Sequence, residues 1–252
     1  MKRQRFAKIA ISTAALAVAV LALVGGAAWV TRGPSPHPHA ASNPHLIPDM
    51  VGPIGEGASI WVQRHEVTIA EFNACHDAGG CALWLVARPD QDPANTPATG
   101  LSYPDTQQYV TWLNGATGLD FRLPRVSEWQ AMAETVIPDE PDPIFTDPAL
   151  SWASAYLIEA DLPRALRPSG SFSTTADGIA DLDGSVWEWT DDCYAGTSAP
   201  SRPDRCPAFY VAGVHVAAMS YLERDPARGG CAVGAPPAHL GMRLVSDSAP
   251  TS

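Results

Sequence analysis

Residues 59–66 predict a strand that leads directly into a helix. Thr68 is suited to cap that helix, and Glu71 occupies the position that completes a capping box. The helix is expected to run from Ile69 to Ala78, because Gly79-Gly80 follows and stops it.

Two further helices are predicted where apolar residues recur at intervals of three and four. One is expected over residues 105–117, ended by Gly118, and the other over residues 127–136. Their inward faces are expected to contain Tyr109, Trp112, Leu113 and Ala116 in the first, and Trp129, Met132, Ala133 and Val136 in the second. Residues 89–98 and most of residues 138–180 are expected to form loops.

A longer apolar run lies near the N-terminus, behind the basic residues of segment 1–8. Ile9 to Val30 are 22 residues without a charge, which is long enough to cross about 30 Å of hydrocarbon. We expect a single-pass, uncleaved signal anchor in the inner (plasma) membrane, with the N-terminus in the cytoplasm. The small residues Gly26-Ala27-Ala28 leave signal cleavage open. Both interpretations place the bulk of the chain in the periplasm or at the cell surface.

Residues 31–48 are rich in proline and histidine, which predicts an extended tether. Its histidines are also potential transition-metal ligands, but nothing in the sequence fixes their geometry. We expect one domain over residues 49–246 and a short tail at 247–252.

Composition narrows the class of protein further. The chain of 252 residues has a net charge of −11, which makes nucleic acid a poor partner. Its 8 Trp, 24 Pro and 20 Gly are typical of a loop-rich domain held together by aromatic side chains. The H-E-x-x-H, G-x-S-x-G, P-loop and G-x-G-x-x-G motifs do not occur.

Five cysteines in an oxidising compartment are expected to form two disulfides and leave one thiol. Cys75 and Cys81 flank the end of the first predicted helix, and Cys193 and Cys206 bracket a segment without a core of its own. We predict these two pairs. The fifth cysteine, Cys231, is then either a free thiol or a link to a partner.

The segment Asp181 to Asp191 contains a glutamate, Glu188, between two tryptophans. In an extended chain, both indoles would face one side and Glu188 the other. A carboxylate leaves water only if it is paired or bound to a metal. Glu188 and Asp181 are therefore interpreted in one of two ways. Either both are ligands of a hard cation such as calcium, or Glu188 forms a salt bridge with an arginine and Asp181 caps a turn.

The same segment resembles a family signature. Residues 178–189 are similar to the G-L-x-D-M-x-G-N-V-W-E-W block of the formylglycine-generating-enzyme-like (sulfatase-modifying factor) domain. Three further blocks of that family occur in order: Glu66-Val67-Thr68 with Glu71-Phe72, Phe121-Arg122-Leu123-Pro124 with Glu128-Trp129, and Gly241-Met242-Arg243-Leu244. The resemblance implies an irregular, loop-rich α+β fold of the C-type-lectin-like kind with bound calcium. It assigns the calcium ligands to the Asp181 and Glu188 carboxylates and the Gly184 and Val186 carbonyls.

The resemblance also implies a copper-dependent oxidase with two thiolates five residues apart. In this chain Ala217 and Leu222 stand at those positions, and neither side chain binds copper. We therefore expect no copper and no oxidase activity, and interpret the chain as a binding or accessory subunit of a membrane or periplasmic assembly, with a protein partner. The alternative is an enzyme of the periplasmic pyoverdine-maturation type that uses His215, Glu223 or His239.

Overall fold

The computed structural model describes residues 44–55, 60–137, 144–159, 164–194, 206–226 and 235–250. The predicted anchor, residues 9–30, and Cys231 lie outside these ranges. Within them, no helix is long and apolar enough to cross a membrane.

The first sheet joins segments from both ends of the domain. Its strand order is β1-β2-β8-β3, and all neighbouring strands are antiparallel. The strands are β1 (Met50–Ile54), β2 (Ile60–Gln63), β3 (Phe121–Arg122) and β8 (Val245–Ser246). β2 lies within the predicted strand 59–66. The two-residue strands β3 and β8 are too short to predict from periodicity.

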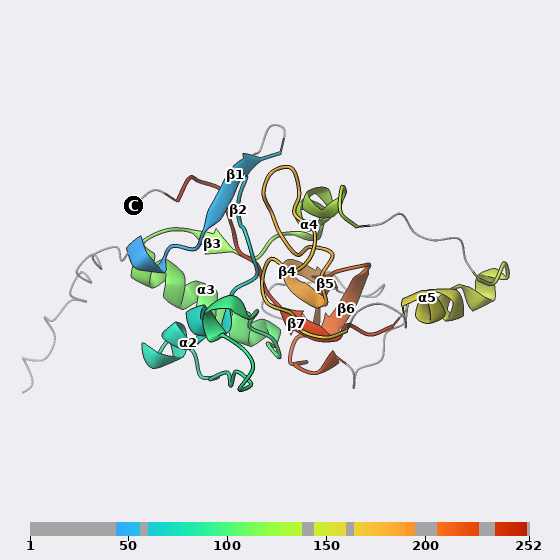
Figure 1. The fold of residues 1–252 in the computed structure, drawn as a ribbon, viewed down its shortest axis with the longest axis horizontal. Helices are drawn as coiled ribbons and strands as arrows, with labels where there is room; N and C mark the ends of the chain where they lie inside the picture. The colour runs from blue at the N-terminus through green and yellow to red at the C-terminus, as the bar shows by residue number, and fades with distance from the viewer. Residues whose placement is uncertain are drawn as a thin grey trace, which may run out of the picture. The chain divides into compact units, whose positions relative to one another are not determined.

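The second sheet has the order β6-β5-β4-β7, and β7 runs parallel to β4. Its strands are β4 (Val186–Tyr194), β5 (Ala208–Ala212), β6 (Val216–Ser220) and β7 (His239–Gly241). Figure 1 shows this sheet beside α4, which packs on β4 and β5. The turn between β5 and β6 therefore lies next to α4.

The three predicted helices are all present. The first, α2 (Ile69–Asp77), has the capping box of Thr68 and Glu71. The second, α3 (Tyr103–Thr117), begins two residues early because Ser102 and Asp105 form another capping box, and it ends at Gly118 in a left-handed conformation. The third, α4 (Val126–Ala133), ends three residues before its predicted end. Short 3-10 helices occur at η3 (Pro44–Leu46), η4 (Pro93–Asn95) and η5 (Pro148–Leu150).

One helix was not predicted. We expected residues 138–180 to be mostly loop, but α5 (Ser151–Glu159) lies within them and packs against η5. Apart from Glu159 at its end, its residues are apolar or small on every side, so the sequence has no polar–apolar period from which a helix is recognised. In Figure 1, α5 lies apart from both sheets.

Strand β4 separates two apolar clusters, and this determines where its side chains point. Trp187 and Trp189 belong to the larger cluster, which is built around α2 and α3. Glu188 points the other way and meets Trp129 of the second cluster, which is built around α4 and the first sheet. The predicted alternation of the two indoles and the glutamate is thus present, with all three side chains buried.

Candidate functional site

The carboxylate of Glu188 is held entirely by protein donors. The guanidinium of Arg243 donates from Nε to both carboxylate oxygens at 3.1 and 3.2 Å and from Nη2 to Oε1 at 2.9 Å. Trp129 donates its indole N–H to Oε2 at 2.8 Å. Glu188 and Arg243 are both 0% exposed. Of the two interpretations of Glu188, the geometry favours the arginine pair.

Arg243 also links three separate segments of backbone. Its Nη1 donates to the carbonyls of Gln63 and Arg64 at 2.9 and 2.6 Å, and its Nη2 donates to the carbonyl of Ala180 at 2.8 Å. With the bonds to Glu188, all five guanidinium N–H groups have acceptors. Every donor of this buried cation is therefore paired, either with the carboxylate or with one of three carbonyls, as burial of a charge requires.

A second buried carboxyl, Glu66, lies beside this pair. Its Oε2 is 3.9 Å from Arg243 Nη2 and accepts no hydrogen bond within the described part of the chain. Burial raises the pKa of Glu66 to about 8, with Arg243 lowering the pKa and the charges of Glu188 and Asp181 raising it. Arg243 thus faces three acidic groups, and the raised pKa of Glu66 favours its protonated form at neutral pH.

Asp181 organises the loop that precedes β4. Its side chain accepts hydrogen bonds from the amides of Gly170 and Phe172, and its Oδ2 lies 3.3 Å from His65 Nδ1. Its φ of 67° is in the left-handed region that non-glycine residues seldom adopt. Gly184 closes the turn by donating its amide to the Asp181 carbonyl at 2.9 Å.

This arrangement does not fit the calcium ligand set at Glu188. A cation bound there would have to displace the Arg243 guanidinium, and it would then lie beside a buried positive charge. In the ranges that the structure describes, no group of three or more His, Cys, Asp or Glu side chains is arranged to hold a metal ion. Calcium binding by the Asp181, Gly184 and Val186 oxygens stays a prediction.

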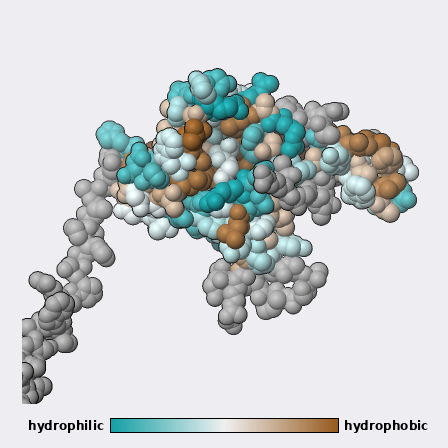
Figure 2. Space-filling view, turned by 90° about the horizontal axis from the view of Figure 1, so that it is seen from below, coloured by the Kyte–Doolittle hydropathy of each residue, from teal (hydrophilic) through white to brown (hydrophobic). Residues whose placement is uncertain are grey.

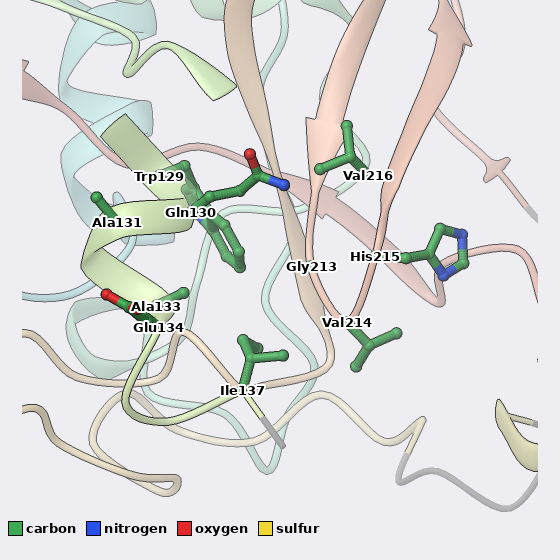
Figure 3. Close-up of a pocket in the computed structure, with 10 residues that line it drawn as sticks. All are labelled: Trp129, Gln130, Ala131, Ala133, Glu134, Ile137, Gly213, Val214, His215 and Val216. Atoms are coloured by element: carbon green, nitrogen blue, oxygen red, sulfur yellow. The ribbon is translucent and has the colours of Figure 1, made fainter. Parts of the chain in front are cut away.

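A pocket of about 430 Å³ lies between α4 and the turn from β5 to β6. Figure 3 shows its two walls: α4 and the residues after it on one side, and the hairpin on the other. The lining includes polar groups of Gln130 and Glu134 and apolar groups of Ile137, Val214 and Val216. An open pocket with apolar walls and few polar groups is typical of a binding site.

His215 lies at the far edge of this pocket, and its ring points away from α4 (Figure 3). Its Nδ1 is 2.7 Å from Glu159 Oε1 at the end of α5, and Glu159 Oε2 accepts the amide hydrogen of Ala235. The Trp187 indole and the imidazole are perpendicular, with a centroid distance of 4.5 Å. The carboxylate and the indole fix the position of the ring outside the central space of the pocket.

The other residues proposed for catalysis are not gathered around His215. Glu223 accepts the amide hydrogens of Arg224 and Asp225 and so caps a local turn. His239 lines a separate groove, with its Nε2 3.1 Å from the carbonyl of Arg164. Burial is the largest effect on the pKa of His239 and lowers it, and the nearby arginines add to this effect.

The two positions that the family resemblance assigns to the thiolates lie at and just after β6. Ala217 is buried in the core, and Leu222 is 61% exposed. The four cysteines of the described ranges form the two predicted disulfides, Cys75–Cys81 and Cys193–Cys206. No described cysteine is therefore available as a thiolate, and the fate of Cys231 stays a prediction.

Sequence reasoning did not assign roles to two acidic residues at these sites. Glu66 was recognised only as part of a motif, because its burial depends on Arg243, which lies 177 positions further along the chain. Glu159 lies in a helix that was not predicted. Neither residue has a local pattern that indicates its partner, so only the three-dimensional structure reveals them.

The buried carboxylate–arginine cluster, the two small sheets and the long loops define a mixed α/β domain of the C-type-lectin-like kind. A model of the sulfatase-modifying factor enzyme 1-like (FGE-sulfatase) domain matches residues 39–248. The chain therefore belongs to the sulfatase-modifying factor, or formylglycine-generating-enzyme-like, family. None of the curated proteins with which the chain was compared matches it.

Three solved structures match the chain at low sequence identity and with TM-scores below 0.5. PvdO from Pseudomonas aeruginosa is 21% identical, with a TM-score of 0.49 over 78% of this chain and 89% of that one. CarF is 16% identical, with a TM-score of 0.48 over 79% and 93% of the two chains. Treponema denticola variable protein 1 is 12% identical, with a TM-score of 0.49 over 80% of this chain and 92% of that one.

Proposed function

We propose that this chain is a membrane-anchored, extracytoplasmic binding or accessory subunit that does not carry out the oxidation associated with its family resemblance. One observation carries the proposal. Ala217 and Leu222 occupy the positions of the thiolate pair, and every described cysteine is in a disulfide. A methyl and an isobutyl group provide neither a soft ligand for copper nor a redox-active sulfur.

The pocket between α4 and the β5–β6 turn is the proposed contact site for a partner. Its apolar side chains, Ile137, Val214 and Val216, gain from leaving water when a partner covers them. Gln130 and Glu134 at the α4 wall provide polar groups that would orient the partner.

The oxidase part of this proposal is tested with purified full-length protein, added copper and a cysteine-containing sulfatase-type peptide. We expect no formylglycine in the peptide by mass spectrometry, with an active family oxidase as the positive control. Formation of formylglycine at any copper concentration would contradict the proposal.

The binding part is tested by purification of the native membrane complex. A partner that co-purifies in a fixed ratio with the wild type should be lost from Val214→Asp and retained by Val86→Asp. Val86 is 75% exposed and lies outside the pocket, so it is a matched control for an added surface charge. Equal recovery of the partner with both variants would exclude the pocket as the contact site.

The His215–Glu159 pair favours an acid/base enzyme as a second candidate, because a carboxylate that fixes an imidazole is a common catalytic arrangement. The orientation of the ring away from α4 argues against its acting on a molecule in the pocket. The test is conversion of small molecules from a periplasmic extract. An enzyme would lose this activity in His215→Asn and keep it in His76→Asn, whereas a binding subunit would convert nothing.

A further inference from the structure

Helix α5 carries an uncharged surface that the rest of the described domain does not cover. Residues 148–158, between Asp147 and Glu159, contain no charged side chain. Within this run Trp152 is 57% exposed and Tyr156 is 49% exposed, while only Ser154 of the helix is buried. A helix on a water-exposed surface normally has a charged or polar face, whereas the one charged side chain of α5, Glu159, lies at its C-terminal end.

The exposed apolar side chains of α5 and the segment before it lie between residues 144 and 157, with Asp147 as the charged residue among them, and we call them the α5 patch. It comprises Ile144, Phe145, Leu150, Trp152, Tyr156 and Leu157. Trp152 and Tyr156 are four residues apart and so lie on the same side of the helix. Figure 2 shows apolar surface gathered on α5. Exposed apolar regions of this kind mark interaction surfaces.

The tether that precedes the domain favours a lipid bilayer as the occupant. Pro44, the first described residue, lies fourteen residues after Val30, the end of the predicted anchor. A proline-rich tether of this length reaches about 45 Å at about 3.1 Å per residue. A domain held that close to a bilayer has a high effective concentration at its surface, so even a weak surface contact would be populated.

The composition and length of the helix also fit the membrane interface. Trp and Tyr are enriched at the boundary between headgroups and hydrocarbon. A nine-residue helix is about 14 Å long, which is too short to cross about 30 Å of hydrocarbon. Such a helix would lie within the interface and bury its apolar side chains there.

The charges next to the helix set the lipid preference. Glu159 is held by His215 and the Ala235 amide, so its charge is directed into the domain. The chain as a whole has a net charge of −11 and would be repelled by anionic lipids. The contact should therefore be apolar and insensitive to salt, and it should be stronger on zwitterionic phosphatidylcholine than on anionic lipids.

We propose that the α5 patch docks into the interface of the bilayer to which residues 9–30 anchor the domain. This inference rests on the anchoring in the proposed function. It is tested with the full-length chain reconstituted into phosphatidylcholine vesicles that contain a photoactivatable diazirine phosphatidylcholine. Mass spectrometry of the digested protein then locates the residues that react with lipid. We expect labelling of both 9–30 and 144–158.

Two pairs of substitutions make the test specific. Trp152→Ser with Leu157→Ser should reduce labelling of residues 144–158 at least tenfold and leave labelling of 9–30 unchanged. Trp84→Ser with Val86→Ser is the matched control, because Trp84 and Val86 are 51% and 75% exposed and lie outside the patch. The control pair should not alter the labelling of either segment, and the wild-type segment around Trp84 should remain unlabelled.

The outcomes separate the inference from the anchoring on which it rests. Labelling of 9–30 without 144–158 overturns the inference and supports the anchor. Labelling of 144–158 without 9–30 supports the docking and rejects the anchor, and absence of both rejects both. If the α5 patch in native membranes cross-links to a protein and not to lipid, a protein covers it and the inference is wrong.

Discussion

Replacement of Arg243 by methionine would test the claim that the cluster around Glu188 holds the domain together. Methionine retains much of the length of the side chain but removes the charge and all five N–H donors. The variant leaves Glu188 without its cationic partner at a position with no access to water. It also removes the donors to three backbone carbonyls, from β2, the residue after it and the loop before β4.

The expected cost follows from these contacts. Removal of one partner from a buried ion pair costs about 3–5 kcal/mol, because the other charge remains buried. The lost carbonyl bonds act in the same direction at about 1 kcal/mol each, although the energies of one network are not additive. We expect the free energy of unfolding to fall by at least about 4 kcal/mol. For a domain of about 200 residues, this lowers the Tm by about 8–16 °C.

The free energy of unfolding that Arg243→Met loses should also depend on pH. Arg243 lowers the pKa of Glu66, so its removal would raise that pKa further above the value of an unfolded glutamate. A carboxyl with a raised pKa in the folded state stabilises the fold fully below its unfolded pKa, and this contribution is lost as pH rises through the folded pKa. Arg243→Met should therefore cost less at pH 5 than at pH 8.

Urea unfolding at both pH values, followed by tryptophan fluorescence, measures the effect. Arg122→Met is the matched control, because Arg122 is partly exposed and pairs with Glu128 and Asp247 near the surface. Ion pairs near the surface contribute about 0–1 kcal/mol to the free energy of unfolding. A cost below about 1 kcal/mol for Arg243→Met, or equal costs for both variants, would refute the reasoning.

Glu188→Gln distinguishes the arginine pair from a calcium site at the same residue. If Arg243 is the partner, the substitution costs about 3 kcal/mol, because the buried guanidinium loses its anion, and the cost is the same with and without a chelator. If calcium binds Glu188, a chelator destabilises the wild type but not the variant. The melting curves of both proteins with and without chelator, together with elemental analysis, decide between the two.

Three further outcomes are expected. The wild-type free energy of unfolding should fall as pH rises from 4.5 to about 8, because folded Glu66 retains a proton that the unfolded chain releases. Urea titrations of Glu66→Gln should show a flatter dependence on pH. An unchanged slope in that variant would contradict the assignment. Joint replacement of Cys193 and Cys206 by serine should cost about 3 kcal/mol in the same assay, by the loop-entropy argument, and no change would show that the bridge is dispensable. Intact-mass analysis of the native protein should find residues 9–30 retained, and a mature N-terminus near Ala28 or beyond would exclude the anchor.

Features with a local cause were predictable from the sequence. The capping box of Thr68 and Glu71 and the stop at Gly118 define helix ends within a few residues, and the structure contains both. The Cys75–Cys81 pair was predicted because six positions separate the two residues across a helix end. The alternation around Glu188 was also predictable, because it follows from the geometry of a strand.

Features that depend on distant segments were not predictable in the same way. The strand partners β2 and β8 come from opposite ends of the domain, and pairing of β4 with β7 joins Glu188 to Gly241. The acceptors of Arg243 at Gln63 and Arg64 lie nearly 180 positions away. The sequence indicated that Glu188 needs a positive partner, but calcium and arginine satisfy the same requirement. Only the arrangement of the chain distinguishes them.

The positions of these groups separate the central network from the two positions that the family resemblance assigns to thiolates. The Glu188–Arg243 pair lies in the interior where β4, the loop before it and β2 meet, and it connects segments from both ends of the domain. Ala217 lies in β6, an edge strand of the second sheet, Leu222 lies just after it, and neither contributes to that pair. Substitutions at the edge strand therefore leave the central network intact. The exposed surface of α5 supplies no donor to the carboxylate of Glu188, whereas the pocket beside α4 shares Trp129 with it. A binding role for the pocket is therefore compatible with the central network as long as Trp129 is kept.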